Sequence, residues 1–243
     1  MALKSEASRL LLSYAWWIIE PILFVLLYYF VFAVLLRKSQ ENFLLFLLCG
    51  KVPFMWFSKS VTLASNSIAQ NKYLITQLDI PKIIFPMVSI QQSLYKESFV
   101  FALMIGIAFA FGHWPNQFWL LLIPLFLVQY LLIFVVSVLG AIAVARMTDC
   151  RMVINMTMTF LLFVSGVFWD INSIHDMRLK NALVFANPIA FLLDSYRRII
   201  IHGEMINLPY LALLTIFLLL AAYILTVFVF RRGRLIASWA LNS

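Results

Sequence analysis

Residues 209–230 read PYLALLTIFLLLAAYILTVFVF and are followed directly by the basic run RRGR at residues 231–234. The apolar stretch contains no charged side chain. A helix needs roughly 20 predominantly apolar residues to cross the ~30 Å hydrocarbon core of a bilayer, so this stretch predicts a transmembrane helix. Arginines at the end of a span favour the cytoplasmic side of the membrane.

The rest of the chain has the same composition. Of its 243 residues, 64% are hydrophobic and 12% are charged, whereas an ordinary globular domain has roughly 45–50% apolar and about 25% charged residues. A membrane β-barrel would instead show alternating segments of about 10 residues. We therefore predict an all-α, polytopic membrane protein with six transmembrane helices. The expected spans cover about residues 16–36, 43–68, 88–112, 117–144, 152–169 and 209–230.

Two of the connecting segments have the pattern of short surface helices. Residues 1–15 place apolar side chains at helical spacing between Lys4 and Arg9, which predicts an amphipathic helix on the membrane surface. Residues 69–86 are too polar to span and end in two prolines, so they predict a short helix outside the bilayer.

The longest connection, residues 170–208, contains two apolar stretches that are too short to cross, at 182–186 and 189–193. Irregular backbone at membrane depth is tolerated only where protein or water covers it. We expect two re-entrant or interfacial helices there, on the outer side. Residues 231–243 are expected to form a cytoplasmic tail.

The net charge of +8 is distributed in small groups between the apolar spans. This distribution indicates membrane orientation rather than nucleic-acid binding, because no basic face is formed. Lys and Arg are more frequent on the side that carries the N-terminus, so we expect both termini in the cytoplasm. The two cysteines, Cys49 and Cys150, fit no zinc or redox spacing, and we assign neither a disulfide nor a metal.

Catalytic motifs are missing from the sequence. The only Gly-Lys pair, at Gly50, has Leu45 in place of the first glycine of a phosphate-binding loop. The sequence has no His-Glu-x-x-His helix and no nucleophile elbow. The chain therefore cannot bind ATP through a phosphate loop, and an intramembrane enzyme is the weaker class.

Five short motifs, in this order, resemble the membrane subunit of ABC exporters that move lipid-linked polysaccharides such as O-antigen or capsule across the inner membrane of Gram-negative bacteria. The similarity covers nearly the whole chain. The motifs are Tyr14–Pro21 (YAWWIIEP), Gly50–Phe54 (GKVPF) with Phe57–Ser58, Asn71–Ile75 (NKYLI) with Ile80–Lys82 (IPK) and Pro86, Ser165–Trp169 (SGVFW), and Asn187–Pro188 with Tyr196–Arg197 and Gly203.

The resemblance implies a homodimer in which each copy binds a separate ATP-binding subunit, so that ATP and Mg²⁺ are held by that partner. The family commonly has an arginine where this chain has Lys82, which keeps the charge and loses the fork geometry. For Arg146 and Arg151, ordinary charged loop ends remain the alternative. The implied contacts with the ATPase are Asn71, Lys72, Tyr73, Leu74, Ile75, Pro81, Lys82, Arg146, Asp149 and Arg151.

Charged and aromatic residues in the spans suggest a path for the substrate. Lys51 and Lys59 are about 12 Å apart along a helix, and burying a charge costs ~2.5–3.5 kcal/mol, so we expect at least one to face a wet channel. Aromatic rings can stack on the C–H faces of sugars. The predicted channel residues are Trp16, Trp17, Glu20, Tyr28, Tyr29, Lys51, Lys59, Phe163, Phe168 and Trp169. The predicted outer re-entrant residues are Asn187, Pro188, Tyr196 and Arg197.

Other readings stay open at this point. An exporter of the same architecture for another lipid, a drug or teichoic acid is the nearest alternative. An ion-coupled secondary transporter would need paired acidic residues at the midplane and usually internal repeats, neither of which is clear. An intramembrane enzyme is disfavoured because no convergent acid/base set can be named.

Overall fold

The computed structural model describes residues 43–77 and 80–242, with a few separate positions between residues 19 and 31. The predicted surface helix at 1–15 and most of the predicted first span at 16–36 lie outside the described residues. So do five predicted channel residues: Trp16, Trp17, Glu20, Tyr28 and Tyr29.

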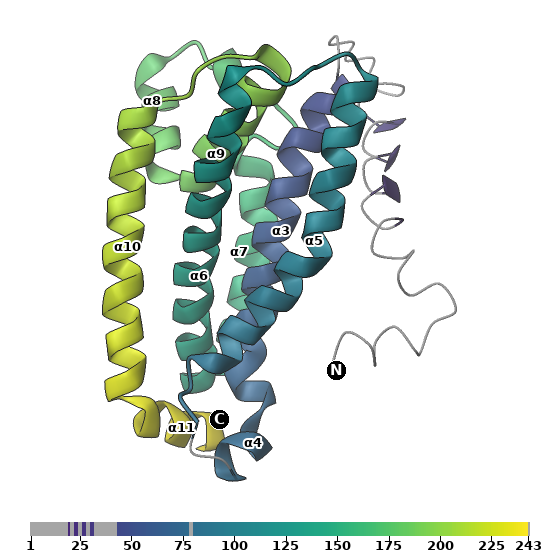
Figure 1. The fold of residues 1–243 in the computed structure, drawn as a ribbon. Coiled ribbons are helices and arrows are strands. Elements are labelled where there is room, and N and C mark those ends of the chain that lie inside the picture. Colours follow the sequence, from purple (N-terminus) through teal and green to yellow (C-terminus); the bar gives the residue numbers. More distant parts are fainter. Residues whose placement is uncertain are drawn as a thin grey trace. The chain divides into compact units, whose positions relative to one another are not determined.

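The described part of the chain is helical and contains no strand (Figure 1). Its elements are α3 (Phe43–Gln70), α4 (Lys72–Gln77), α5 (Ile84–Ala110), η2 (Gln117–Leu121), α6 (Leu122–Arg146), α7 (Cys150–Val164), η3 (Ile171–Ser173), α8 (Met177–Ala186), α9 (Pro188–Arg197), η4 (Arg198–His202), α10 (Leu208–Arg231) and α11 (Gly233–Asn242).

Four of these helical segments are long and apolar enough to cross a membrane. They match four of the predicted spans to within a few residues, because long apolar runs are local features of the sequence. The chain is therefore a multi-pass, all-helical membrane protein, and the count of six spans stays a prediction. The four candidate spans are Phe43–Gln70, Ile84–Ala110, Gln117–Arg146 and Leu208–Arg231.

The predicted fifth span is shorter than expected. The sequence suggested 152–169, but α7 ends at Val164 and has 15 residues, which gives a length of about 22 Å. The cause is Gly166, whose φ of +74° lies in the left-handed region and turns the chain out of the helix. As a result α7 is a shorter apolar helix and does not meet the length of a candidate span.

The chain divides into two compact units, which we call unit 1 and unit 2, and each is described by itself. Unit 1 comprises Met1–Met55, Tyr95–Trp119 and Ser165–Met205. Unit 2 comprises Trp56–Leu94, Leu120–Val164 and Ile206–Ser243.

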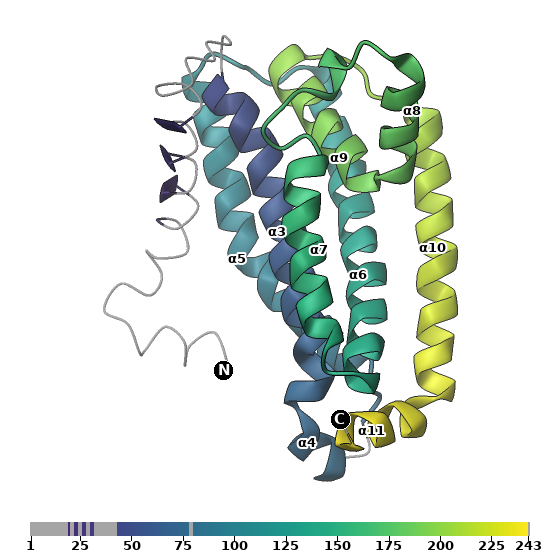
Figure 2. The ribbon, with the colours of Figure 1, turned by 180° about the vertical axis from the view of Figure 1, so that it is seen from behind.

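In unit 2, α10 lies along α6, and α11 turns across the end of α10 to reach both α6 and α4 (Figures 1 and 2). Gly140 allows α6 to pack closely against α3. A Cβ at this position would overlap Ser65 Oγ and lie 2.9 Å from Ser65 Cβ. An apolar cluster joins α3, α4, α5, α6, α10 and α11. Its members include Ile68, Ile75, Phe85, Val138, Ala141, Val229 and Ile236.

In unit 1, the two short apolar stretches of the long connection form α8 and α9, which pack against each other. Each begins at a side-chain cap: Asp176 accepts from the amide of Arg178, and Asn187 accepts from the amide of Ala190. The two helices that the sequence suggested in this connection are therefore present. Their depth in a membrane stays a prediction.

Candidate functional site

The predicted coupling segment forms a helix–turn–helix in unit 2. Asn71 separates α3 from α4, and its side-chain Nδ2 donates to the carbonyl of Ser67 at 2.7 Å. An Asn side chain that bonds to nearby backbone competes with continuation of a helix, which explains the break at this residue. The amide of Ile75 still bonds to the carbonyl of Asn71 at 3.1 Å, so the break is a single residue long.

Helix α4 has a buried and an exposed side. Ile75 is 7% exposed within the apolar cluster of unit 2, whereas Tyr73 is 71% exposed and Leu74 is 39% exposed. Lys72 is half-buried. Tyr73 and Leu74 therefore form the exposed side of α4, and Ile75 forms its buried side.

The other predicted coupling residues lie at the end of α6 and the start of α7. Arg146, Asp149 and Arg151 are exposed. The guanidinium of Arg146 lies 5.3 Å from the ring centroid of Trp239, a cation–π contact that fixes α11 to the end of α6. Arg146 thus has a role inside the chain besides its predicted contact with an ATPase.

Helix α11 itself was missed by the sequence interpretation, which treated residues 231–243 as a tail. It contacts α6, α10 and α4, and so connects both predicted coupling regions. Its signal is present in the sequence, because Leu235, Ile236, Trp239 and Ala240 recur at helical spacing. Ile236 and Ala240 are fully buried.

A cavity of about 500 Å³ lies between the coupling segment, the end of α10 and α11; we call it the α4–α11 cavity. Lys82 on its wall is 6% exposed, and it has no hydrogen-bond or ion-pair partner within the described part of the chain. The lining residues are Ile75, Ile80, Pro81, Lys82, Val229, Phe230, Gly233, Arg234, Ala237, Ser238 and Leu241.

Arg197 is a buried cation of unit 1 and is 2% exposed at the end of α9. Its Nε donates to the carbonyl of Phe46 at 3.2 Å, and its two terminal nitrogens donate to the carbonyls of Gly166 at 2.6 Å and Val167 at 2.9 Å. The guanidinium carbon also lies 3.6 Å from the ring centroid of Phe46. Burial lowers the pKa of Arg197 to about 10, so the side chain remains charged at neutral pH.

Gly50 and Asn187 complete this group of residues, which we call the Arg197 cluster. A Cβ at Gly50 would overlap the Arg197 guanidinium and lie 3.0 Å from the carbonyl oxygen of Val167. The side chain of Asn187 donates to Ser165 Oγ at 2.9 Å while it caps α9. Three of the motifs that carried the resemblance, around residues 50, 165 and 187–197, therefore meet in one place.

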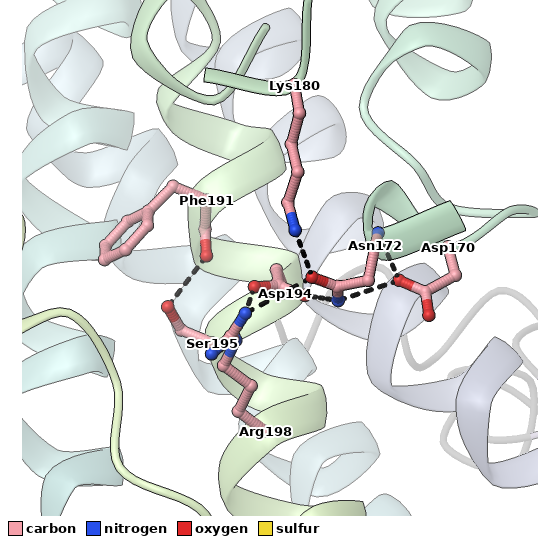
Figure 3. Close-up of polar contacts among 7 residues, drawn as sticks. All are labelled: Asp170, Asn172, Lys180, Phe191, Asp194, Ser195 and Arg198. Carbon is pink, nitrogen blue, oxygen red and sulfur yellow. Dashed lines mark hydrogen bonds and ion pairs between the residues drawn. The ribbon is translucent and has the colours of Figure 1, made fainter. Parts of the chain in front are cut away.

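An exposed polar network joins η3, α8, α9 and η4 in unit 1 (Figure 3). Asn172 is at its centre: Nδ2 donates to Asp170 and Asp194, both at 3.0 Å, and Oδ1 accepts from Lys180 at 2.9 Å. Burial opposes the charge of Arg198, but its 2.7 Å bond to Asp194 and the nearby carboxylates outweigh this and raise its pKa. The sequence interpretation did not find this network, because its members are far apart in the chain.

The remaining outer residues have structural positions. Pro188 occupies the first turn of α9, where the missing amide of proline costs nothing. Tyr196 is 2% exposed, and its ring lies 5.9 Å from that of Phe101 on α5.

The described channel candidates differ in exposure. Lys51 and Phe168 in unit 1 are each 6% exposed, and Trp169 is half-buried. In unit 2, Lys59 is half-buried and Phe163 on α7 is 56% exposed. Phe168 therefore packs inside unit 1, and Phe163 presents the most open aromatic ring.

No family model matches the chain. It is 26% identical over 199 residues to the O-antigen export system permease protein RfbA of Myxococcus xanthus, covering 81% of this chain and 76% of the relative. Two proteins of the same name from Klebsiella pneumoniae are 24% and 23% identical, over 93% and 87% of this chain and 85% and 81% of the relatives.

The apolar helices and these relatives together indicate a multi-pass membrane transport subunit. The resemblance to export permeases of this kind is confirmed by the same relatives, because three O-antigen export permeases match 81–93% of this chain.

Proposed function

We propose that this chain is the membrane-spanning subunit of an ATP-driven ABC exporter that moves a lipid-linked polysaccharide, O-antigen or capsular, from cytoplasm to periplasm. The observation that carries the proposal is the similarity to three O-antigen export permeases over 81–93% of the chain. The Arg197 cluster supports it, since separate motifs of the resemblance form one buried unit. We further propose a homodimer with two copies of a separate ATP-binding subunit, which holds ATP and Mg²⁺.

The proposed arrangement has six spans in the bacterial inner membrane, both termini in the cytoplasm, and residues 170–208 as re-entrant helices on the outer side. In unit 2, α11 brings the basic end of α10 next to α4 and the end of α6. Arg231, Arg232 and Arg234 follow α10 directly, and Arg146 ends α6. Such clustering of Lys and Arg favours the cytoplasmic side.

In this proposal α4 receives the movement of the ATPase. Tyr73 and Leu74 provide the contact, and the buried Ile75 ties α4 to the apolar cluster of unit 2. Because only Asn71 separates α4 from α3, a displacement of α4 is transmitted to the long helix as a rigid-body movement.

In the proposed channel, aromatic rings stack on the sugars of the cargo and lysine side chains attract its negative charges. The exposed Phe163 and the half-buried Trp169 offer faces on which sugars can stack. Lys51 or Lys59 attracts the pyrophosphate or acidic sugars of the cargo.

Complementation tests the function directly. A strain that lacks this gene should lose its surface polysaccharide and regain it when the chain is restored together with its ATPase subunit. Normal surface polysaccharide in the deletion strain would contradict the proposed cargo.

Site-directed crosslinking tests the coupling. In a Cys150→Ser background, where the remaining Cys49 is buried, Tyr73→Cys should crosslink to the ATPase subunit. Trp114→Cys is the matched control, because Trp114 is 73% exposed and lies in a loop that we place on the outer side. Equal crosslinking at both positions, or none at Tyr73 in an active complex, would contradict the coupling role.

Alanine substitutions test the channel. Lys51→Ala and Lys59→Ala should reduce export at normal expression, and Phe163→Ala should do the same. If all three variants export normally, the channel has been assigned to the wrong residues.

A further inference from the structure

We infer that the α4–α11 cavity binds the phosphate headgroup of an anionic membrane phospholipid, with Lys82 and Arg234 as its cationic contacts. The inference rests on the proposed cytoplasmic position of this end of unit 2 and is independent of the polysaccharide cargo. A phospholipid in this position would hold α4 and α11 together and so set how firmly the coupling segment is attached.

The first observation is the charge on the cavity wall. Lys82 is 6% exposed as a residue, and it makes no hydrogen bond or ion pair with another described residue. Arg234 and the hydroxyl of Ser238 also line the cavity, and none of the described lining residues is acidic. The described part of the wall is therefore basic and offers hydrogen-bond donors to an anion.

The backbone adds to the same preference. Helix α11 begins at Gly233 on the cavity wall, and a Cβ built on Gly233 would lie 3.9 Å from Cγ of Lys82. The free amides and the positive end of the helix dipole at an N-terminus favour a phosphate. Lys82 and the start of α11 thus converge on the same small region.

The second observation is the apolar remainder of the wall. Val229 and Phe230 belong to the last turn of the candidate span α10, and Ile75, Ile80 and Leu241 complete the apolar lining. A cavity of about 500 Å³ falls within the range of small-ligand sites. An anion alone would leave the apolar surface unused, whereas a phospholipid brings a phosphate and the first part of an acyl chain.

The third observation is location. The cavity begins where the apolar stretch of α10 gives way to Arg231, Arg232 and Arg234, which is the level of the lipid headgroups. Basic pockets at the cytoplasmic ends of membrane helices bind anionic headgroups, and each nearby Lys or Arg contributes ~1 kcal/mol. Position and charge together favour a membrane phospholipid over a soluble phosphate.

Native mass spectrometry of the purified full chain tests the inference, with titrated phosphatidylglycerol as the probe and phosphatidylcholine as the uncharged comparison. We expect phosphatidylglycerol to be retained and Lys82→Gln or Arg234→Gln to weaken retention by about fivefold each. The double variant should weaken it by about 25-fold. Arg231→Gln is the matched control, because this exposed arginine lies three residues away and does not line the cavity.

A second variant tests the space instead of the charge. Ala237→Phe should fill part of the cavity and weaken phosphatidylglycerol retention by about tenfold with every basic residue intact. The thermal unfolding temperature of each variant is measured beside the binding, so that a folding defect is recognised from its own readout.

Several outcomes would overturn the inference. Unchanged retention by Lys82→Gln, or an equal loss with Arg231→Gln, would mean that the lipid binds elsewhere. Equal retention of phosphatidylcholine would remove the charge argument. Displacement by millimolar inorganic phosphate would make this a free-anion site, and displacement by the ATPase subunit would make it part of the protein contact. If the unsubstituted chain exports polysaccharide but retains no phosphatidylglycerol, this inference alone is refuted and the proposed function stands.

Discussion

Two of the buried cations among the described residues, Arg197 in unit 1 and Lys82 in unit 2, have opposite surroundings. Arg197 donates to three backbone carbonyls and lies on the ring of Phe46. Lys82 is almost as well buried and lines a cavity without a partner in the described part of the chain.

The difference shows how a buried charge can be interpreted. A guanidinium that donates from each of its three nitrogens to the chain's own backbone stabilises the fold, because removing it leaves buried carbonyls unsatisfied. A cation that faces an empty volume contributes little to the fold and is available to a ligand. Burial by itself therefore does not separate structural residues from binding residues; the partners do.

The largest expected effect follows from removing the charge of the Arg197 cluster. Arg197→Met should destabilise unit 1 by about 3–5 kcal/mol, because three buried carbonyls lose their donor. Arg197→Lys should recover only part of this, since an ammonium cannot reproduce the fork of donors. Denaturant unfolding in detergent measures both; a variant as stable as the wild type would break the comparison.

The next effect comes from the space that the guanidinium occupies. Gly50→Ala should cost about 1–3 kcal/mol, because the added methyl group overlaps the guanidinium of Arg197. Gly106→Ala is the control: a Cβ there has no neighbour within 4 Å, so it should stabilise the helix by about 0.5–1 kcal/mol. Similar results for the two variants in thermal unfolding would contradict the cluster's geometry.

A smaller effect is expected at the start of α9. Asn187→Ala should cost about 1–2 kcal/mol, because it removes both the cap and the bond to Ser165. Asn207→Ala removes the cap of α10 alone and should cost less. The difference between the two unfolding free energies measures the contribution of the Ser165 bond, and a difference of zero would show that this bond is not stabilising.

The smallest effect on stability is expected at Lys82. Lys82→Gln should change the unfolding free energy by less than about 0.5 kcal/mol in lipid-free detergent, because no protein bond is lost. Lys72→Gln on α4 is the control for a half-buried lysine outside the cavity. If Lys82→Gln lowered the unfolding free energy by several kcal/mol, Lys82 would stabilise the fold as Arg197 does, and the difference between the two cations would disappear.

The sequence predicted those parts of the molecule that depend on local patterns. Long apolar runs identified four spans, and Asn187-Pro188 separated α8 from α9 as expected. The predicted fifth span ended at about residue 169, whereas α7 ends five residues earlier, at Val164. The apolar pattern does not show the left-handed backbone angle of Gly166 that follows this end. Helix α11 was missed because it is only ten residues long and directly follows a run of arginines, so this segment was interpreted as a cytoplasmic tail.

The tertiary contacts were not predictable in the same way. The bond from Arg197 to Phe46 joins residues 151 positions apart, and Asn172 meets Asp194 across 22 positions. The resemblance placed Gly50 and Arg197 in separate motifs, but only the structure shows that one occupies the space left by the other. Phe168 is buried within unit 1, and its predicted lining role stays a prediction.

The contact between Gly50 and Arg197 has a consequence for the history of the sequence. A side chain at position 50 would overlap the guanidinium where it now lies, so the less costly order of change is loss of the arginine first and a larger residue at position 50 afterwards. Across an alignment of permeases, this order should appear as paired variation between two positions almost 150 residues apart, with glycine required wherever the arginine is kept.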